Sequence, residues 1–169
     1  MECPHIPEIT LERFWEPIRN KIQAKRIPVS GTIEPTLRCN LRCVHCYIPH
    51  DFIEKELSYG EWCQVLDEIV TEGCLWLLIT GGEPFIRDDI LDIYTYAKKK
   101  GMIITLFTNG TLITPKIADY LKEWPPYQVE ITLYGATEET YERITGVHGS
   151  YERCIRAVSY THLRAHETR

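Results

Sequence analysis

Four short apolar or β-branched runs alternate with amphipathic stretches of helical period, and this alternation constrains the fold more than any other feature of the chain. The runs cover residues 32–37, 75–79, 102–107 and 128–133. Ser58 and Glu61 form a capping box that begins the helical stretch after the first run. Strand–helix alternation with short connections requires right-handed crossovers, so we expect an α/β fold with a parallel sheet. The continuous apolar run at 75–79 predicts a strand covered on both faces.

An unusual segment follows each expected strand. These segments are the cysteine-containing residues 38–47, Gly81-Gly82-Glu83-Pro84, Thr108-Asn109-Gly110 and Tyr134-Gly135-Ala136. The carboxyl ends of parallel strands share one edge of a sheet, and active sites of α/β folds form there. We therefore expect the four segments to meet at one mouth. The Asn-Gly pair also suits a plain tight turn, because it tolerates positive φ.

Cys39, Cys43 and Cys46 lie within eight consecutive positions, so one short loop can direct three thiolates at a single point. A structural zinc site normally has a fourth protein ligand, and a cubane cluster normally takes four cysteines. Three thiolates would leave one metal open to an outside ligand. Two other interpretations remain: a zinc-binding module that also uses His45, and a plain α/β domain whose thiols are incidental.

Residues 39–47, together with Gly81-Gly82-Glu83-Pro84, resemble the signature segments of the radical S-adenosylmethionine (radical SAM) enzymes. The resemblance extends from about residue 31 to 157. It implies that the three cysteines hold a [4Fe–4S] cluster whose fourth iron binds S-adenosylmethionine. It also implies that a one-electron donor of the flavodoxin or ferredoxin type reduces the cluster. A 5′-deoxyadenosyl radical then removes hydrogen from a substrate.

The resemblance also assigns cofactor contacts. It implies that Gly81, Gly82, Glu83 and Pro84 hold the methionine amino group, that His45 lies near the adenine, and that Thr132 helps bind the ribose or carboxylate of the cofactor. Thr108 and Asn109 either contact cofactor or substrate or form a plain turn. We expect Gly81 and Gly82 to let backbone approach a ligand, and Glu83 to accept a hydrogen bond from an ammonium group. Tyr134 stands where relatives often have Asp.

The implied fold is a partial (β/α) TIM-type barrel with about four of the usual six βα units. The stretch is most similar to members with SPASM or twitch-type extensions, which modify peptides or complete haem-like and quinone cofactors. A peptide is therefore the first expected substrate, and maturation of a haem-type or quinone cofactor is the alternative.

Three regions are expected along the chain. Residues 1–30 form a helical lead-in with a helix over 10–25, and residues 31–158 form a truncated radical SAM core. Helical periodicity fades after Val158, and residues 159–169 look like translated sequencing-adapter read-through, which predicts a non-native tail on a fragment.

Composition limits the class of protein. The chain of 169 residues is 44% hydrophobic and 25% charged, which is typical of a globular domain, and its net charge of −5 makes nucleic acid an unlikely ligand. The sequence contains neither a membrane-spanning apolar run nor a signal-peptide pattern, so we expect a cytoplasmic protein. Of the seven cysteines, Cys63, Cys74 and Cys154 are expected to pack as small hydrophobes, and Cys3 to be exposed.

Overall fold

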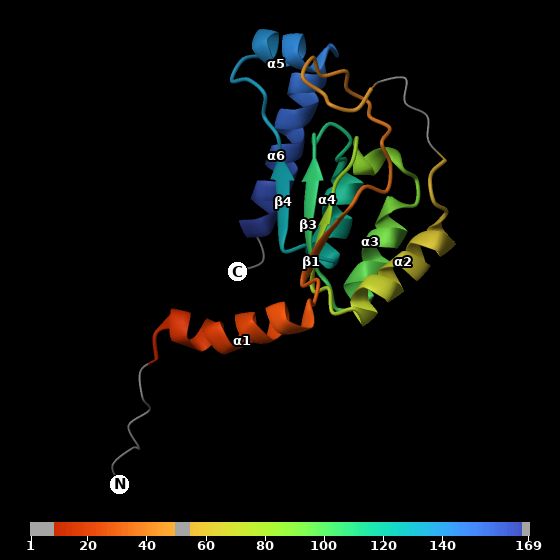
Figure 1. The fold of residues 1–169 in the computed structure, drawn as a ribbon. Helices are drawn as coiled ribbons and strands as arrows, with labels where there is room; N and C mark the ends of the chain where they lie inside the picture. Colours follow the sequence, from red (N-terminus) through yellow and green to blue (C-terminus); the bar gives the residue numbers. More distant parts are fainter. Residues whose placement is uncertain (1–8, 50–54, 167–169) are drawn as a thin grey trace.

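A parallel sheet of four strands forms the centre of the computed structural model, which describes residues 9–49 and 55–166 (Figure 1). The strands lie in the order β1-β2-β3-β4 and span Ser30–Ile33, Trp76–Ile79, Ile103–Thr108 and Gln128–Ile131. Neighbouring strands end in register, since Ile33 pairs with Ile79 and Thr108 pairs with Ile131. This arrangement confirms the expected α/β class and brings the segments after the strands to one edge.

Helices precede, connect and follow the strands. They are α1 (Leu11–Lys25), α2 (Tyr59–Thr71), the 3-10 turn η1 (Pro84–Ile86), α3 (Ile90–Lys99), α4 (Pro115–Glu123), α5 (Glu138–Thr145) and α6 (Ser150–His166). Local sequence signals begin them as expected. Ser58 and Glu61 form the predicted capping box, and the Thr114 side chain accepts a hydrogen bond from the backbone N–H of Ile117.

The core lies on one face of the sheet. Leu77, Ile79 and Ile104 are buried against helices α2, α3 and α4, while Trp76 and Phe107 on the other face are each 38% exposed. The expectation that strand 75–79 is covered on both faces is therefore wrong. An apolar run does not indicate how many faces carry helices, and in the described chain only one face does.

Two strands end earlier than expected. The run 32–37 leaves the sheet at Ile33, because Pro35 lacks an N–H for the ladder and the carbonyl of Thr36 accepts from Gly82 instead. The last strand ends at Ile131, so Thr132 lies one residue beyond it.

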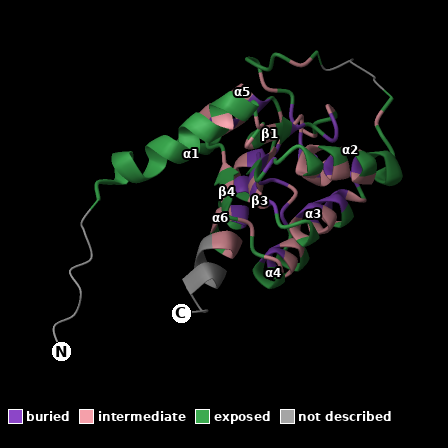
Figure 2. Ribbon diagram, turned by 60° about the horizontal axis from the view of Figure 1, so that its bottom comes forward, coloured by how far each residue is buried: buried purple, intermediate pink, exposed green. Residues whose placement is uncertain are grey.

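The two ends of the described chain are helical. Helix α1 forms as expected and projects from the sheet with no buried residue (Figure 2). Helix α6 continues to His166, beyond the point at which the helical periodicity of the sequence fades. Tyr160 packs beside Ala118 and Ala157, which extends the core along α6. The proposed regional boundaries and the origin of residues 159–169 stay predictions; residues 1–8 and 167–169 lie outside the described part.

The remaining cysteines behave largely as expected. Cys74 and Cys154 are buried and Cys63 is half-buried, whereas Cys3 lies outside the described residues. Within the described ranges, none of the helices has the length and apolar character needed to cross a bilayer.

Candidate functional site

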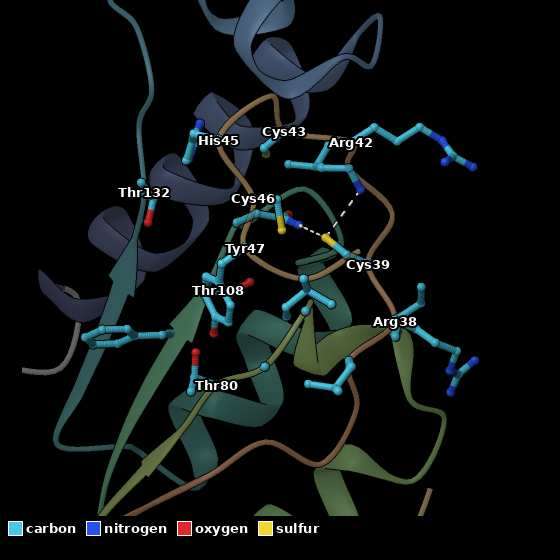
Figure 3. A pocket seen from close by; sticks show the side chains of 18 of the residues that line it. Arg38, Cys39, Arg42, Cys43, His45, Cys46, Tyr47, Thr80, Thr108 and Thr132 are labelled. Carbon is cyan, nitrogen blue, oxygen red and sulfur yellow. Dashed lines mark hydrogen bonds between the residues drawn. The ribbon is translucent and has the colours of Figure 1, made fainter. Parts of the chain in front are cut away.

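A cavity of about 510 Å³ opens at the edge where the strands end (Figure 3). Nine of the expected site residues line it: Cys39, Cys43, His45, Cys46, Gly81, Gly82, Thr108, Asn109 and Thr132. Glu83 and Pro84 do not line it and are buried behind its wall. Leu37, Ile48, Ile86 and Phe107 add apolar surface, which gives the cavity the mixed lining typical of a small-molecule site.

The pair of glycines is required by the protein's own backbone. A Cβ on Gly81 would lie 2.2 Å from the carbonyl oxygen of Thr36, and one on Gly82 would lie 2.3 Å from that of Arg38. The N–H groups of Gly82 and Glu83 donate to these same two carbonyls over 3.0 and 2.9 Å. The sequence suggested close approach to a ligand; the structure shows close approach to the backbone segment that leads from β1 into the cysteine loop. The two glycines thereby fix the position of the backbone that leads into Cys39.

Glu83 joins two strand ends instead of facing the cavity. Its carboxylate is fully buried and accepts hydrogen bonds from the Thr108 hydroxyl at 2.8 Å, the Asn109 N–H at 2.8 Å and the Phe85 N–H at 3.1 Å. Burial raises the pKa of Glu83 above the usual carboxyl value, and these hydrogen bonds oppose the shift. A direct hydrogen bond from an ammonium group to the Glu83 carboxylate, as expected from the sequence, does not fit this geometry.

A ring of polar side chains links β3 to the cysteine loop. Asn109 donates from Nδ2 to Asn40 Oδ1 over 3.0 Å and lies 3.8 Å from the sulfur of Cys39. Asn40 in turn donates to the hydroxyl of Thr111 over 2.7 Å. Sequence reasoning missed Asn40 and Thr111. They are 71 positions apart, and no local pattern indicates that they meet.

The far side of the cysteine loop is tied to α5. The backbone N–H of Arg42 donates to the carbonyl of Thr145 over 2.8 Å, and that of Val44 donates to Ile144 over 3.0 Å. A Cβ on Gly146 would lie 2.8 Å from the carbonyl oxygen of Arg42, so this helix end also approaches the loop closely. The loop is therefore held by segments that follow β2, β3 and β4.

A buried arginine binds the backbone on both sides of the cysteine loop. Arg87 is 6% exposed and donates to the carbonyls of Pro35 and Leu57 over 3.0 and 2.9 Å. It also forms a two-pronged pair with Asp89, and the pKa of that carboxyl is lowered by the hydrogen bonds from Arg87. Sequence reasoning missed this residue because the two carbonyls to which it donates are distant in the chain.

Aromatic side chains form one wall of the cavity. The rings of His45 and Tyr134 lie 4.7 Å apart between centroids, and Tyr134 lies 6.1 Å from buried Tyr141. Burial is the main cause that raises the pKa of Tyr134, with the nearby thiols adding to it. The sequence marked Tyr134 only as a departure from a pattern; the structure makes it a packing partner of His45. Thr132 lines the same cavity (Figure 3).

The thiols suit a group larger than a single ion. Cys39, Cys43 and Cys46 are all free, and burial with the neighbouring thiols raises the pKa of Cys43 to about 11. Among the described residues, one group of three potential metal ligands has its ligand atoms within 4.8 Å of one another, and it consists of Glu138, Glu142 and His148. The sulfurs of the three cysteines do not form such a group. A lone zinc ion needs ligands about 2.0–2.3 Å from the metal, so the zinc interpretation fits this loop poorly. A cluster with several metals accommodates wider sulfur spacing.

The set formed by Glu138 and Glu142 on α5 and by His148 beyond it has a structural explanation. His148 pairs with Glu142, whose carboxylate also accepts backbone hydrogen bonds from Gly149 and Tyr151 at the start of α6. Burial alone would raise the pKa of Glu142, but these hydrogen bonds outweigh it and the pKa is lowered. Glu142 thus caps α6.

Comparison with known proteins identifies relatives. The model of the radical SAM superfamily matches residues 33–164. An Fe-coproporphyrin III synthase from Methanosarcina barkeri is 38% identical over 73% of this chain and 31% of its own length. A mycofactocin maturase, MftC, from Mycobacterium tuberculosis is 35% identical over 78% of this chain and 34% of its own length. The chain thus spans about a third of the curated relatives it matches.

Solved structures share the fold. SuiB from Streptococcus suis bound to the precursor peptide SuiA superposes with a TM-score of 0.72 at 21% identity, covering 97% of this chain and 39% of SuiB. SuiB bound to S-adenosylmethionine gives a TM-score of 0.73 at 22% identity, over 86% of this chain and 35% of SuiB. This likeness confirms the expected partial (β/α) barrel, of which the described chain contains four strands.

Proposed function

Since this chain belongs to the radical SAM superfamily, whose cofactors are a [4Fe–4S] cluster and S-adenosylmethionine, we propose that Cys39, Cys43 and Cys46 hold the cluster and that the adjoining cavity receives S-adenosylmethionine. One observation carries this proposal. Three free thiols from a single loop line a cavity of about 510 Å³, and none of the other described cysteines lines it. Such a donor set leaves a coordination position for an outside ligand.

When bound, the two cofactors together supply a 5′-deoxyadenosyl radical that removes a hydrogen atom from an unreactive carbon. The protein's own residues position and shelter this chemistry. Gly81 and Gly82 set the register of the cysteine loop, and Glu83 holds the ends of β2 and β3 together. His45 offers a planar ring for the adenine, and Thr132 offers a hydroxyl for the ribose or carboxylate. Thr108 and Asn109 border the same space.

Two substrate classes have support from the relatives. A peptide is the first candidate, because SuiB binds a precursor peptide and another relative is a PqqA peptide cyclase, 28% identical over 85% of this chain. Maturation of a haem-type or quinone cofactor is the second, because relatives include an Fe-coproporphyrin III synthase and an AdoMet-dependent heme synthase. Transfer of deuterium from a labelled peptide or porphyrin into 5′-deoxyadenosine would distinguish them.

Two further features belong to the proposal. The reaction needs one electron, which a flavodoxin or ferredoxin supplies. The cysteines proposed to hold the cluster are not paired in disulfides, which suits the reducing conditions of the cytoplasm.

Anaerobic reconstitution tests the assignment. The expected product is a brown protein with bound iron and sulfide that forms 5′-deoxyadenosine from S-adenosylmethionine after reduction. Cys43→Ser should lose most of the iron, whereas Cys63→Ser, on α2 and away from the cavity, should retain it. One colourless zinc per chain would instead support the zinc interpretation. Equal iron in both variants would mean that the thiols are incidental.

A further inference from the structure

The amide group of Asn109 lies against a sulfur that the proposed function assigns to the cluster. Its Nδ2 atom is 3.8 Å from the Sγ of Cys39, and the backbone N–H of Leu41 donates to the same sulfur over 3.4 Å (Figure 3). Among the described residues, neither Cys43 nor Cys46 has a side-chain amide donor of this kind. Cys39 therefore has a different electrostatic environment from the other two cysteines.

The orientation of this amide is determined by its surroundings. The Oδ1 atom of Asn109 accepts from the backbone N–H of Thr111 over 2.9 Å and from its hydroxyl over 2.7 Å. A backbone N–H can only donate, so the oxygen of Asn109 must face Thr111. The NH₂ group must then face Cys39 and Asn40. The oxygen and the NH₂ group of the Asn109 side chain cannot be exchanged, because the NH₂ group would then face the backbone N–H of Thr111 and both groups are donors.

The position of Asn109 is also fixed along the chain. Its backbone N–H donates to buried Glu83 over 2.8 Å, and Asn40 completes the side-chain ring by donating to the Thr111 hydroxyl over 2.7 Å. Asn109 is 9% exposed and Thr111 is 6% exposed. Water therefore screens this donor little, which strengthens its effect on a nearby charge.

We propose that the Asn109 side chain donates a hydrogen bond to the Cys39 sulfur and raises the reduction potential of the cluster bound there. The proposal rests on the proposed function, because it requires the cluster. Reduction by one electron makes the sulfur ligands more negative, and an N–H donor stabilises the added charge. Asn109 thus acts as a positioning and tuning residue, with Asn40, Thr111 and Glu83 holding its amide in place.

A redox titration of the anaerobically reconstituted full chain, monitored by EPR, tests this role. Asn109→Leu keeps a similar shape and removes the donor. At the wild-type midpoint, the ratio of reduced to oxidised cluster in this variant should fall by about tenfold, because hydrogen bonds to charged groups are the strong ones. For a one-electron couple, a tenfold change corresponds to a midpoint about 59 mV more negative.

Thr111 provides a matched pair that leaves Asn109 in the chain. Thr111→Val removes the hydroxyl but keeps the backbone donor, so the midpoint should move in the same direction by a smaller amount. Thr111→Ser retains the hydroxyl and should restore the wild-type value. This pair decides the question if Asn109→Leu fails to load iron.

The outcomes separate the two proposals. Loaded variants of Asn109 and Thr111 with the wild-type midpoint would overturn the tuning role and leave the proposed function intact. A midpoint that becomes more positive in Asn109→Leu would also overturn it. A wild-type chain that binds no cluster under any anaerobic condition would overturn both.

Discussion

Replacing Gly82 with Ala should destabilise the folded chain before any cofactor binds. The added Cβ would lie 2.3 Å from the carbonyl oxygen of Arg38 and 2.5 Å from that of Leu37, whereas ordinary contact begins at 3.4 Å. Both obstacles are backbone atoms, so relief requires the segment leading into Cys39 to move by about 1 Å. That displacement would carry the first cysteine of the loop away from its place.

The expected magnitude follows from two losses. Overpacking of a close-packed site costs about 1–3 kcal/mol. Moving the Arg38 carbonyl also breaks its 2.9 Å hydrogen bond from the Glu83 N–H, worth about 1 kcal/mol. We therefore expect the free energy of unfolding to fall by about 2–4 kcal/mol, a large share of the 5–15 kcal/mol typical of a domain.

Urea unfolding of the cofactor-free protein measures this change. Gly60→Ala is the matched control, because a Cβ there meets nothing within 4 Å and the residue lies inside α2. The control should gain about 0.5–1 kcal/mol from helix propensity. If Gly82→Ala unfolds within about 0.5 kcal/mol of wild type and loses only affinity for S-adenosylmethionine, the glycine serves ligand approach and our reasoning is wrong.

Two further variants test the surroundings of the cavity. Arg87 lowers the pKa of Asp89, so their ion pair stabilises the fold at pH values above the usual pKa of a carboxyl group. This stabilisation is lost as the pH falls through the lowered pKa of Asp89. In Asp89→Asn, the free energy of unfolding should therefore depend less steeply on pH in the acid range; an unchanged slope would contradict this. Tyr134→Ala should weaken S-adenosylmethionine binding about three- to tenfold in equilibrium dialysis, because His45 loses its ring contact, while Tyr134→Phe should bind normally. Equal weakening in both variants would assign the effect to the Tyr134 hydroxyl.

The sequence predicts the sheet because its signals are local. Runs of apolar residues separated by capped helices specify strands, helices and parallel crossovers, and the expected capping box at Ser58 forms. Parallel topology then places the segments after the strands at one edge, which explains why most expected site residues line one cavity.

Features that depend on tertiary contact escaped the same reasoning. Nothing in the run 75–79 reveals that Trp76 faces away from the helices. A glycine pair after a strand suits both a ligand and a neighbouring backbone, and only the position of Thr36 and Arg38 distinguishes them. Glu83 has the chemistry to hold an ammonium group, yet its three partners lie within the fold.

The most direct test of the central claim is to identify the ligand that binds the fourth iron of a reconstituted cluster. Electron–nuclear double resonance on the reduced protein, with ¹⁵N in the amino group of S-adenosylmethionine, should show nitrogen coupled to the cluster. A parallel sample with ¹⁵N-labelled histidine should show no coupling from an imidazole ligand. Coupling from His45 instead, abolished in His45→Ala, would mean that the protein itself fills the last coordination position and would contradict the account.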